Sequence, residues 1–455
     1  MTEPTVEQFS CLKCGGPVVL RAPDVSEAVV CTQCKAILDV SDENVRLLQE
    51  FEGAITKKPL IPLGTRGKIF DGEFEVIGFM VRKITVDYES YRWSEYLLYN
   101  PLQGYRWLTE YEGHWNKVEV LASPPLKGHW MGRSNNMTVD EITYKHFQQS
   151  SPEVECVLGE FYWKVKVGDK AELNDFVSPP HMMSVEKTPS EVSWSRGTYV
   201  DPGEIWSAFG LDGFPPFRKG VFANQPNPHA AASKGAGKTF GILAALAIGV
   251  YAFLSFHAKE ERVLHQEFTY NQDEAEPSRV SDPFVLRGRP TNVRVRSWAN
   301  VDNDYIYLHM TLVNQDTDQA MDFGREISYY HGRDVDGNWS EGKQNDTVFL
   351  PHVPPGNYYL RVEPEKDVRQ NRLTWAFNYR IDVDRDVPRI SYLFYALLLL
   401  LIPFGLFKYL HFAFERDRWN ESDHPYQTEG AVNPADVLKA VLVIAGLILA
   451  LWLDA

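Results

Sequence analysis

The sequence CLKCGG at residues 11–16 is followed by CTQC at residues 31–34, and these two stretches decide how the N-terminal part folds. Each stretch holds two cysteines with two residues between them, a spacing typical of a four-cysteine zinc site. Four thiolates complete a tetrahedral shell and leave no position for water, so such an ion is structural. The alternatives are a redox Cys-x-x-Cys pair or an iron centre, and the tandem pairs favour zinc. We therefore expect a zinc ribbon over residues 8–40 whose Zn²⁺ ion has four ligands: Cys11, Cys14, Cys31 and Cys34.

Composition limits what the rest of the chain can be. The 455 residues are 44% hydrophobic and 13% aromatic, which predicts a folded protein of several domains. A formal net charge of −15 argues against a nucleic-acid partner, and the expected ribbon offers only Lys13, Arg21 and Lys35 as a basic surface. Outside the two pairs the only cysteine is Cys156, which excludes an extracellular disulfide framework.

Three apolar segments predict membrane-spanning helices, which need roughly 20 mostly apolar residues. They cover residues 240–256, 390–407 and 437–453, the last with Lys439 near its start. The alternative for each is a buried core helix. Pro403 and Gly405 predict a kink or an end in the second segment. In the third, Gly446 and Ala450 would let helices approach closely, within one chain or between copies of a homo-oligomer.

The segments between these helices read mostly as β-structure. Residues 59–211 contain short runs of β-branched and aromatic residues separated by Gly and Pro, which predicts a β-barrel or β-sheet domain of one or two subdomains. A duplication is indicated by Gly-Glu-Phe at 72–74 and 159–161 and by Pro-Pro at 124–125 and 179–180.

The remaining segments complete the expected order. Residues 212–239 are rich in Pro, Gly and Ala and predict a linker. The recurring strand patterns of 257–389 predict a β-sandwich, and 408–436 a loop. The expected fold is thus a mainly β, multidomain membrane protein with three transmembrane helices.

Basic residues next to the apolar segments indicate the orientation. Lys234 and Lys238 precede the first segment, whereas basic residues beyond it are offset by glutamates. The N-terminus has no basic stretch followed by an apolar one, so no cleaved signal peptide is expected. These patterns place the N-terminal part in the cytosol and residues 257–389 outside the cytoplasmic membrane.

Other motifs carry weaker signals. The stretch SKGAGKTF at 233–240 follows Ala232, where a phosphate-binding loop needs its first Gly, so we interpret its lysines as membrane anchors. DVDGNWSE at 334–341 partly matches a calcium loop, but a hairpin turn fits better. His114, near Glu112, and His181 are candidate catalytic residues, although packing at strand ends explains such histidines more simply.

Tryptophans are numerous in the first β-rich region. We interpret them as its core and rim, with a ligand-binding aromatic face as the alternative. They are Trp93, Trp107, Trp115, Trp163 and Trp194.

Two strings in this region, WSEYLLYNPLQGYRWLTEYEGHW and GEFYWKVKVGDKAELNDFVSPPHMMSVEKTPSEVSWSRGTYV, resemble a bacterial family of unknown function. That family often follows an N-terminal zinc ribbon and precedes membrane spans, and the resemblance covers residues 8–215. It implies a genomic setting with phage-shock-type membrane-stress proteins, small membrane proteins and polyamine-synthesis genes. It supplies no catalytic residues, because the family has no established activity.

We therefore expect a non-enzymatic, membrane-anchored adaptor of the bacterial cytoplasmic membrane, with a protein partner on its cytosolic side and no cofactor beyond the structural zinc. The outer sandwich would contact an envelope component. The alternative is a membrane-bound hydrolase or ligase, which predicts a polar cluster in a deep pocket around His114 or His181. A transport subunit would need assembled copies, because Lys439 is the only charge within the spans.

Overall fold

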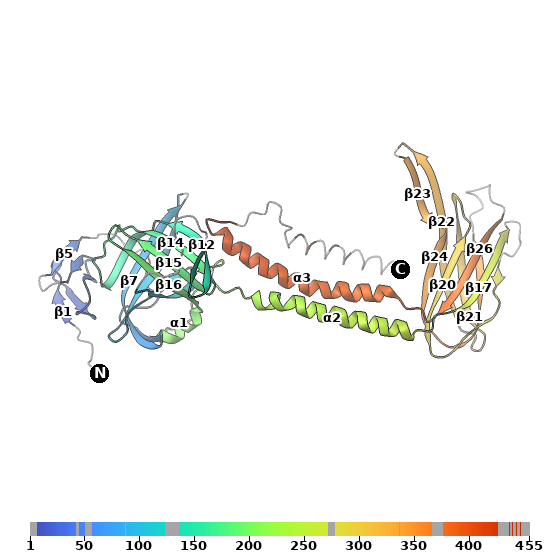
Figure 1. Ribbon diagram of the computed structural model, residues 1–455, viewed down its shortest axis with the longest axis horizontal. Helices are drawn as coiled ribbons and strands as arrows, with labels where there is room; N and C mark the ends of the chain where they lie inside the picture. The colour runs from blue at the N-terminus through green and yellow to red at the C-terminus, as the bar shows by residue number, and fades with distance from the viewer. Residues whose placement is uncertain are drawn as a thin grey trace. The chain divides into compact units, whose positions relative to one another are not determined.

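The computed structural model describes residues 7–41, 45–50, 57–86, 88–122, 136–271, 278–335, 337–365 and 376–425, with Asp436, Lys439, Val443 and Gly446 (Figure 1). The chain divides into two compact units. The first comprises 1–237 and 402–455, and the second comprises 238–401. The expected third span at 437–453 lies outside the described residues except for three of its positions.

Five short strands form the N-terminal ribbon. They are β1 (Glu7–Ser10), β2 (Pro17–Leu20), β3 (Ala28–Val30), β4 (Ile37–Asp39) and β5 (Arg46–Gln49). Strands β1 and β2 pair with each other, while β3, β4 and β5 continue into a larger sheet. Cys11, Val18, Val29, Cys31 and Leu38 are buried in a small core around the cysteines.

The larger sheet is antiparallel, and its order is β11-β12-β14-β15-β16-β10-β9-β8-β7-β13-β3-β4-β5, with β6 also paired to β7. The first strands after the ribbon are β6 (Arg66–Ile69), β7 (Gly72–Val86), β8 (Glu89–Asn100), β9 (Gly104–Tyr111) and β10 (His114–Val120). The next are β11 (Asn136–Val139), β12 (Ile142–Ser150), β13 (Glu153–Phe161), β14 (Glu172–Ser178), β15 (His181–Lys187) and β16 (Val192–Val200). Ribbon and β-rich region are therefore joined by one continuous hydrogen-bonded sheet.

The β-rich region contains an internal duplication. One copy consists of strands β6–β10, and the other consists of strands β11, β12, β14, β15 and β16. The sheet runs from β11 to β16 through the second copy and then from β10 back to β6 through the first, so the two copies have mirrored strand orders. Both copies open with the same hairpin: two residues of positive φ, 70–71 in one copy and 140–141 in the other, turn the chain between short strands. Each hairpin then buries an aromatic side chain at the matching place, Phe74 or Tyr144. Strand β13 is an insertion in the second copy.

The registers of the two copies agree in detail. The pairing of β7 with β8 shifts at Ile77, and the pairing of β12 with β14 shifts at Phe147, so one extra residue bulges at the corresponding position. Strands β10 and β16 occupy equivalent places in the two copies and pair with each other. Their equivalent residues Glu119 and Arg196 lie directly opposite each other. A pseudo-two-fold axis therefore passes between β10 and β16.

The sequence landmarks of the duplication were wrong, although a duplication is present. Residues 72–74 begin β7, whereas residues 159–161 end the inserted strand β13, which has no counterpart in the first copy. The pair at 179–180 forms the turn between β14 and β15, and residues 124–125 lie outside the described part. The repeat is carried by turn geometry and register, which tolerate different side chains, so a short identical string does not locate it.

Helix α1 (Pro202–Phe209) closes the β-rich region. The Asp201 side chain accepts a hydrogen bond from the Gly203 N–H, and Gly210 ends the helix in the left-handed conformation. The Phe209 ring lies so close to Gly67 that a Cβ there would be 2.6 Å from it. The helix thus covers the hairpin that opens the first copy.

The second unit contains a β-sandwich whose two sheets lie face to face (Figure 1). One sheet has the order β17 (Glu261–Asn271), β26 (Ala376–Arg385), β20 (Thr291–Ala299), β24 (Asn345–Val353). The other has the order β18 (Arg279–Val280), β25 (Gly356–Glu365), β21 (Asp304–Asn314), β22 (Ala320–Asp334), β23 (Gly337–Lys343), with β19 (Phe284–Leu286) also on β25.

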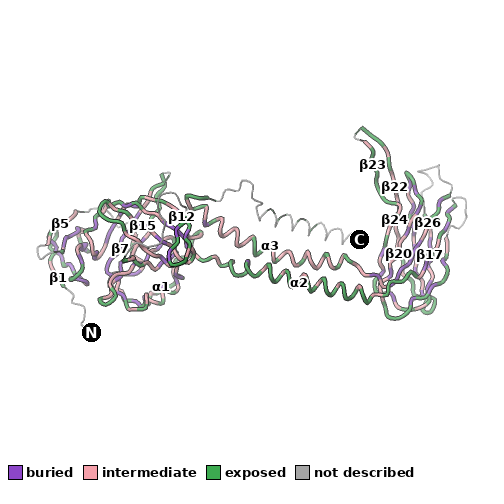
Figure 2. The backbone as a smooth tube through the Cα atoms, in the orientation of Figure 1, coloured by how far each residue is buried: buried purple, intermediate pink, exposed green. Residues whose placement is uncertain are grey.

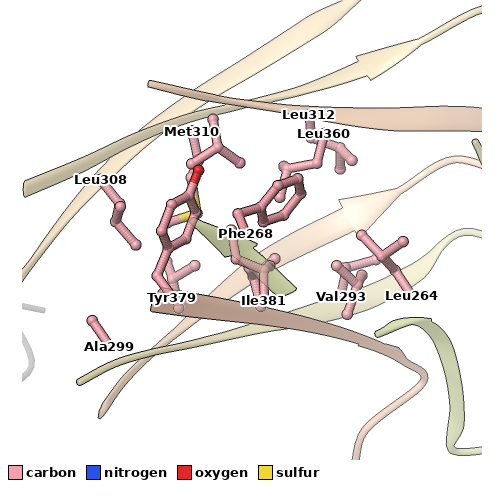
Figure 3. Close-up of a cluster of buried hydrophobic side chains, with 14 of the residues drawn as sticks. Leu264, Phe268, Val293, Ala299, Leu308, Met310, Leu312, Leu360, Tyr379 and Ile381 are labelled. Atoms are coloured by element: carbon pink, nitrogen blue, oxygen red, sulfur yellow. The ribbon is translucent and has the colours of Figure 1, made fainter. Parts of the chain in front are cut away.

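Alternating apolar side chains fill the sandwich, as expected for strands with one buried face. On β21 every second residue is buried, including Leu308 and Met310. Figure 3 shows these side chains meeting Phe268, Tyr379 and Ile381 from the other sheet. The Phe268 and Tyr379 rings stack with centroids 5.2 Å apart.

Two helices are long and apolar enough, by length and composition, to cross a membrane: α2 (Ala230–His257) and α3 (Ile390–Asn420). The apolar stretches of these helices are not buried against the protein, and Figure 2 shows these stretches exposed or half-buried.

The limits of these helices correct three predictions. Helix α2 begins at Ala230, so the predicted linker 212–239 is too long, because its alanines and lysines favour a helix over a coil. Helix α3 does not end near Pro403, and it continues to Asn420 through the first part of the loop predicted at 408–436.

Candidate metal centre and the contacts that hold it

The four cysteines lie at two similar turns. The Cys11 N–H donates to the Gly16 carbonyl, and the Cys31 N–H donates to the Ala36 carbonyl, at 2.8 and 2.9 Å. The residue after each pair, Gly15 or Lys35, has a positive φ near 65°, at 70° and 62°. Each turn therefore folds back under its own two sulfur atoms.

The turns bring all four sulfur atoms within 4.8 Å of one another. The Cys11 and Cys34 sulfurs are 3.6 Å apart, and the Cys14 and Cys31 sulfurs are 3.7 Å apart. Four sulfurs at about 2.3 Å from one tetrahedral Zn²⁺ would lie about 3.8 Å from each other. The cluster is therefore consistent with a metal site such as zinc, in which the sulfurs fill every position.

The surroundings favour a thiolate at Cys11. Burial acts to raise its pKa, but hydrogen bonds from the Cys14 and Lys13 backbone N–H groups outweigh it and lower the pKa to about 7. At Cys34 burial prevails and raises the pKa to about 12. N–H groups aimed at a sulfur stabilise the charge that a metal-bound thiolate carries.

A buried carboxylate, Glu160 on β13, holds the ribbon to the β-rich region. Its two oxygens accept hydrogen bonds from the Arg21 N–H at 2.6 Å, the Ala22 N–H at 2.9 Å and the Ser26 hydroxyl at 3.0 Å. Burial raises the pKa of Glu160 even though these donors oppose it. The loop between the two cysteine pairs is thus fixed by a residue more than a hundred positions away.

Two glycines allow the same junction to close. Gly78 on β7 pairs with Gly159 on β13. A Cβ at Gly159 would lie 2.1 Å from the Ile77 carbonyl oxygen. A Cβ at Gly78 would lie 2.4 Å from the backbone carbonyl oxygen of Glu160. Gly159 also has a φ of 81°, which favours glycine.

A second set of contacts holds the β-rich region to the end of helix α3. Arg418 is only 1% exposed. Its guanidinium donates to the carbonyls of Phe222, Ala223 and Gln225 at 3.3, 2.6 and 2.6 Å. Its Nε donates to a Glu415 carboxylate oxygen at 3.0 Å. One side chain therefore joins the helix to the segment that follows the β-rich region.

Neighbouring side chains extend this contact. Trp419 packs on Phe147 of β12 with ring centroids 5.7 Å apart. The Gln149 N–H donates to the Asp423 carboxylate at 2.7 Å, and His146 and His424 share a hydrogen bond of 2.9 Å. The roles of Arg418 and Glu160 could not be predicted from the sequence, because nothing local distinguishes them from other charged residues.

The structure does not bring the candidate catalytic histidines into a shared site. His114 is buried, with Nδ1 3.0 Å from the Tyr199 hydroxyl and Nε2 3.0 Å from the Lys219 carbonyl. The carbonyl can only accept, so Nε2 carries the proton, and burial lowers the pKa of this imidazole. His181 Nδ1 and the Thr198 hydroxyl share a hydrogen bond of 3.1 Å.

The cavity near α1, of about 510 Å³, is lined by Lys68, Asp71, Lys117 and Glu204 among others, and by neither histidine. Glu112 lies 3.8 Å from Lys219 and makes no described contact with His114. His114 is joined through Tyr199 to Arg218 and Asp201, but neither histidine lines this cavity.

The tryptophans differ in their surroundings. Trp115 and Trp107 are buried, Trp163 packs on Trp107 with centroids 5.7 Å apart, and Trp194 is partly buried. Trp93 donates to Glu95 at 2.7 Å. This supports their interpretation as core and rim.

Glu95 belongs to a charged cluster that the sequence did not reveal. Arg82, which is buried, binds both oxygens of Glu186 at 2.8 and 3.0 Å and lies 3.7 Å from Glu95. Burial raises the pKa of Glu95, despite the opposing charge of Arg82. The cluster joins β7 and β8 to β15, which are far apart in the order of the sheet.

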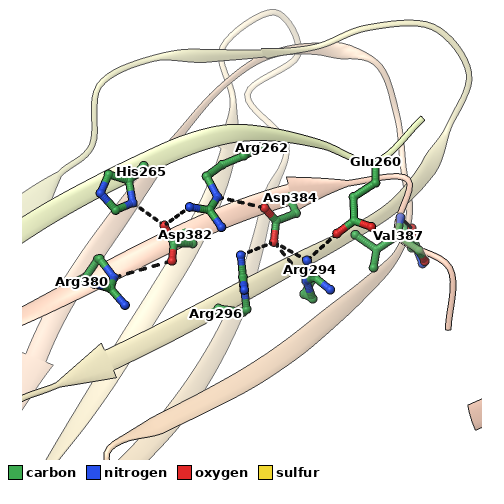
Figure 4. A network of polar contacts seen from close by, with 10 residues as sticks. Glu260, Arg262, His265, Arg294, Arg296, Arg380, Asp382, Asp384 and Val387 are labelled. Atoms are coloured by element: carbon green, nitrogen blue, oxygen red, sulfur yellow. Dashed lines mark hydrogen bonds and ion pairs between the residues drawn. The ribbon is translucent and has the colours of Figure 1, made fainter. Parts of the chain in front are cut away.

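On the sandwich, two carboxylates of β26 organise a network of cations (Figure 4). Asp384 lies 2.7 Å from Arg294, 2.9 Å from Arg296 and 3.3 Å from Arg262. Burial acts to raise the pKa of Asp384, but Arg294 and the other guanidinium groups keep it below its ordinary value. Asp382 accepts from His265 at 2.5 Å. The network ties β17, β20 and β26 together.

The other motifs have structural explanations. Residues 233–240 lie inside helix α2 and follow no strand, so they form no phosphate loop. Residues 334 and 337 pair at the end of the β22–β23 hairpin, as the turn interpretation predicted.

Together these features define a mainly β protein with a four-cysteine cluster consistent with a metal site, large antiparallel sheets and two long apolar helices. Residues 62–202 match the domain of unknown function DUF4178, so the chain carries this domain directly after the ribbon. The matched residues coincide with the duplicated strands β6–β16. No curated protein matches the chain.

Solved structures give only distant similarities. The structure of infectious bursal disease virus Gt strain is 8% identical, with 80% of this chain and 67% of that chain covered and a TM-score of 0.18. PNGF-II is 6% identical, with coverage of 69% and 67% and a TM-score of 0.20. A carbohydrate-binding module of the β-sandwich superfamily covers 59% of this chain and 96% of its own, at 7% identity and a TM-score of 0.13. Scores this low carry no argument about fold or function.

Proposed function

We propose that this protein is a non-enzymatic adaptor of the bacterial cytoplasmic membrane, in which a zinc ribbon and the DUF4178 domain form one cytosolic protein-binding module. Helices α2 and α3 span the membrane and lead to an outer β-sandwich, which contacts an envelope component. The expected link to membrane stress rests on family resemblance alone.

The observation that carries this proposal is the attachment of the module at both ends. Glu160 fixes the ribbon to the sheet, and Arg418 fixes the sheet to the extension of α3. Buried charged groups held by several hydrogen bonds are costly to separate. The ribbon is therefore held in one position relative to α3, as an adaptor that presents a surface near a membrane requires.

The ribbon also has an apolar surface suited to a protein partner. Leu12, Val19 and Leu47 are 58%, 42% and 42% exposed. The chain carries a formal net charge of −15, so a protein surface is a better match than a nucleic acid.

Crosslinking in intact membranes followed by affinity purification tests the proposal. Cys11→Ser/Cys14→Ser removes the metal site, and Leu12→Ser changes the exposed surface while keeping all four ligands. We expect a specific protein recovered with the natural chain to be lost with both variants, and to be kept with Val192→Ser, a matched apolar-to-serine change on β16. Recovery of the same proteins with all forms would refute the adaptor function of the ribbon.

Membrane insertion is tested separately by carbonate extraction and by protease added from the outside. We expect the chain to resist extraction, and we expect cleavage within 257–389 but none within 8–211. Extraction by carbonate, or outside cleavage in the N-terminal module, would refute the proposed topology.

A further inference from the structure

A cavity of about 740 Å³ lies within the second unit, between α2, α3 and the base of the sandwich. Its helical walls are apolar and include Leu246 and Val250 from α2 and Leu393 and Leu400 from α3. Its volume is within the range of roughly 300–1,000 Å³ found for small-molecule sites. The cavity is therefore large enough for a ligand that is mostly hydrocarbon.

The end of the cavity nearest the sandwich is polar and positively charged. Arg289, Asp386 and Arg389 line it there. Arg289 lies 3.7 Å from Asp386, whereas Arg389 makes no ion pair with any carboxylate of the described residues. Instead, its guanidinium lies over the rings of Phe349 and Tyr392, at 4.4 and 5.1 Å from their centroids. Two arginines against one carboxylate leave a net positive charge at this end.

The dimensions also match one leaflet of a bilayer. The lining residues of α2 run from Leu243 to Ser255, about 18 Å at a rise of about 1.5 Å per residue. On α3 they run from Tyr392 to Leu400, about 12 Å by the same measure, and Arg389 directly precedes the helix. Half of a hydrocarbon core of roughly 30 Å is about 15 Å. Arg389, at the start of α3, thus lies about one leaflet's depth from the far end of the groove on this helix.

We propose that this cavity binds an anionic phospholipid, with an acyl chain between α2 and α3 and the phosphate on Arg389 and Arg289. A guanidinium binds phosphate oxygens through paired hydrogen bonds, and the aromatic rings under Arg389 hold it in place to do so. The inference rests on the proposed membrane insertion of the two helices. The other occupant to be tested is the chain's own apolar segment 437–453.

The first test uses the full chain, purified from membranes in mild detergent and analysed by native mass spectrometry with phosphatidylglycerol and phosphatidylcholine as probes. We expect the natural chain to retain phosphatidylglycerol preferentially. Arg289→Gln/Arg389→Gln should lower its retention at least about tenfold, because charge-assisted hydrogen bonds are lost. Arg325→Gln, a matched change elsewhere on the sandwich, should retain it as the natural chain does. Equal retention by all three forms would overturn the proposal.

The second test places photoreactive benzoyl-phenylalanine at position 246, inside the groove. An adduct with phospholipid supports the proposal, and a crosslink to residues 437–453 overturns it. Carbonate extraction of the same variants distinguishes failure of the lipid site from failure of the proposed membrane insertion. Variants that stay in the membrane but retain no lipid refute only the lipid site, whereas a natural chain that is extracted refutes the proposed membrane function.

Discussion

Replacing Arg418 with methionine removes the guanidinium that joins helix α3 to the segment after the DUF4178 domain, while keeping most of the apolar stem. Three carbonyl oxygens and one carboxylate lose a donor. Breaking a buried ion pair on one side costs about 3–5 kcal/mol. We expect the lower end, about 3 kcal/mol, because Glu415 is partly exposed and keeps a hydrogen bond from Asn227 at 2.9 Å.

Hydrogen exchange followed by mass spectrometry measures this contact directly. A loss of about 3 kcal/mol should speed exchange in residues 222–227 roughly 100-fold, while the strands of the sheet keep their protection. Arg416→Met is the matched control, because Arg416 is half-exposed and, within the part of the chain that the structure describes, binds only its neighbour Asp417. Unchanged exchange in Arg418→Met, or an equal change in the control, would show that the guanidinium does not hold the two elements together.

Three further changes test the metal centre, the junction and the buried histidine. Cys14→Ser should abolish bound zinc, as measured by atomic absorption, whereas Cys156→Ala, in the core away from the cluster, should keep it. Gly159→Ala should destabilise the module of ribbon and β-rich region by more than about 1–3 kcal/mol in urea unfolding, because a Cβ would meet a carbonyl oxygen and φ is positive. Gly168→Ala has an equally positive φ but open space around it, and should cost less. His114 has a lowered pKa, so the unfolded state binds its proton first: stability should fall as pH drops below about 6.5, at no more than about 1.4 kcal/mol per pH unit. His114→Phe should flatten that slope, and an unchanged slope would contradict the assignment.

The cysteine spacing predicted the metal cluster because all four ligands lie in two short local turns. Alternation of apolar residues likewise predicted the sandwich strands, and long apolar runs predicted α2 and α3. These signals are local in the chain.

The contacts between elements could not be predicted in this way. Glu160 and Arg418 have ordinary sequence neighbours, and the backbone groups that they bind lie more than a hundred residues away. The start of α2 was missed because alanines and glycines occur together before Phe240, and composition alone does not decide between linker and helix there. The duplication was misaligned because its copies share turns and registers rather than residues.

The two bulges at Ile77 and Phe147 occupy equivalent positions in the repeat, but they have different neighbours. Ile77 packs in the core that contains ribbon residues, and Phe147 packs with Trp419 at the end of α3. The bulged residue thus packs toward the ribbon in the first copy and toward the end of α3 in the second copy. A repeated half-module thus offers two equivalent projecting residues on one sheet, and this chain uses one toward the ribbon and the other toward helix α3.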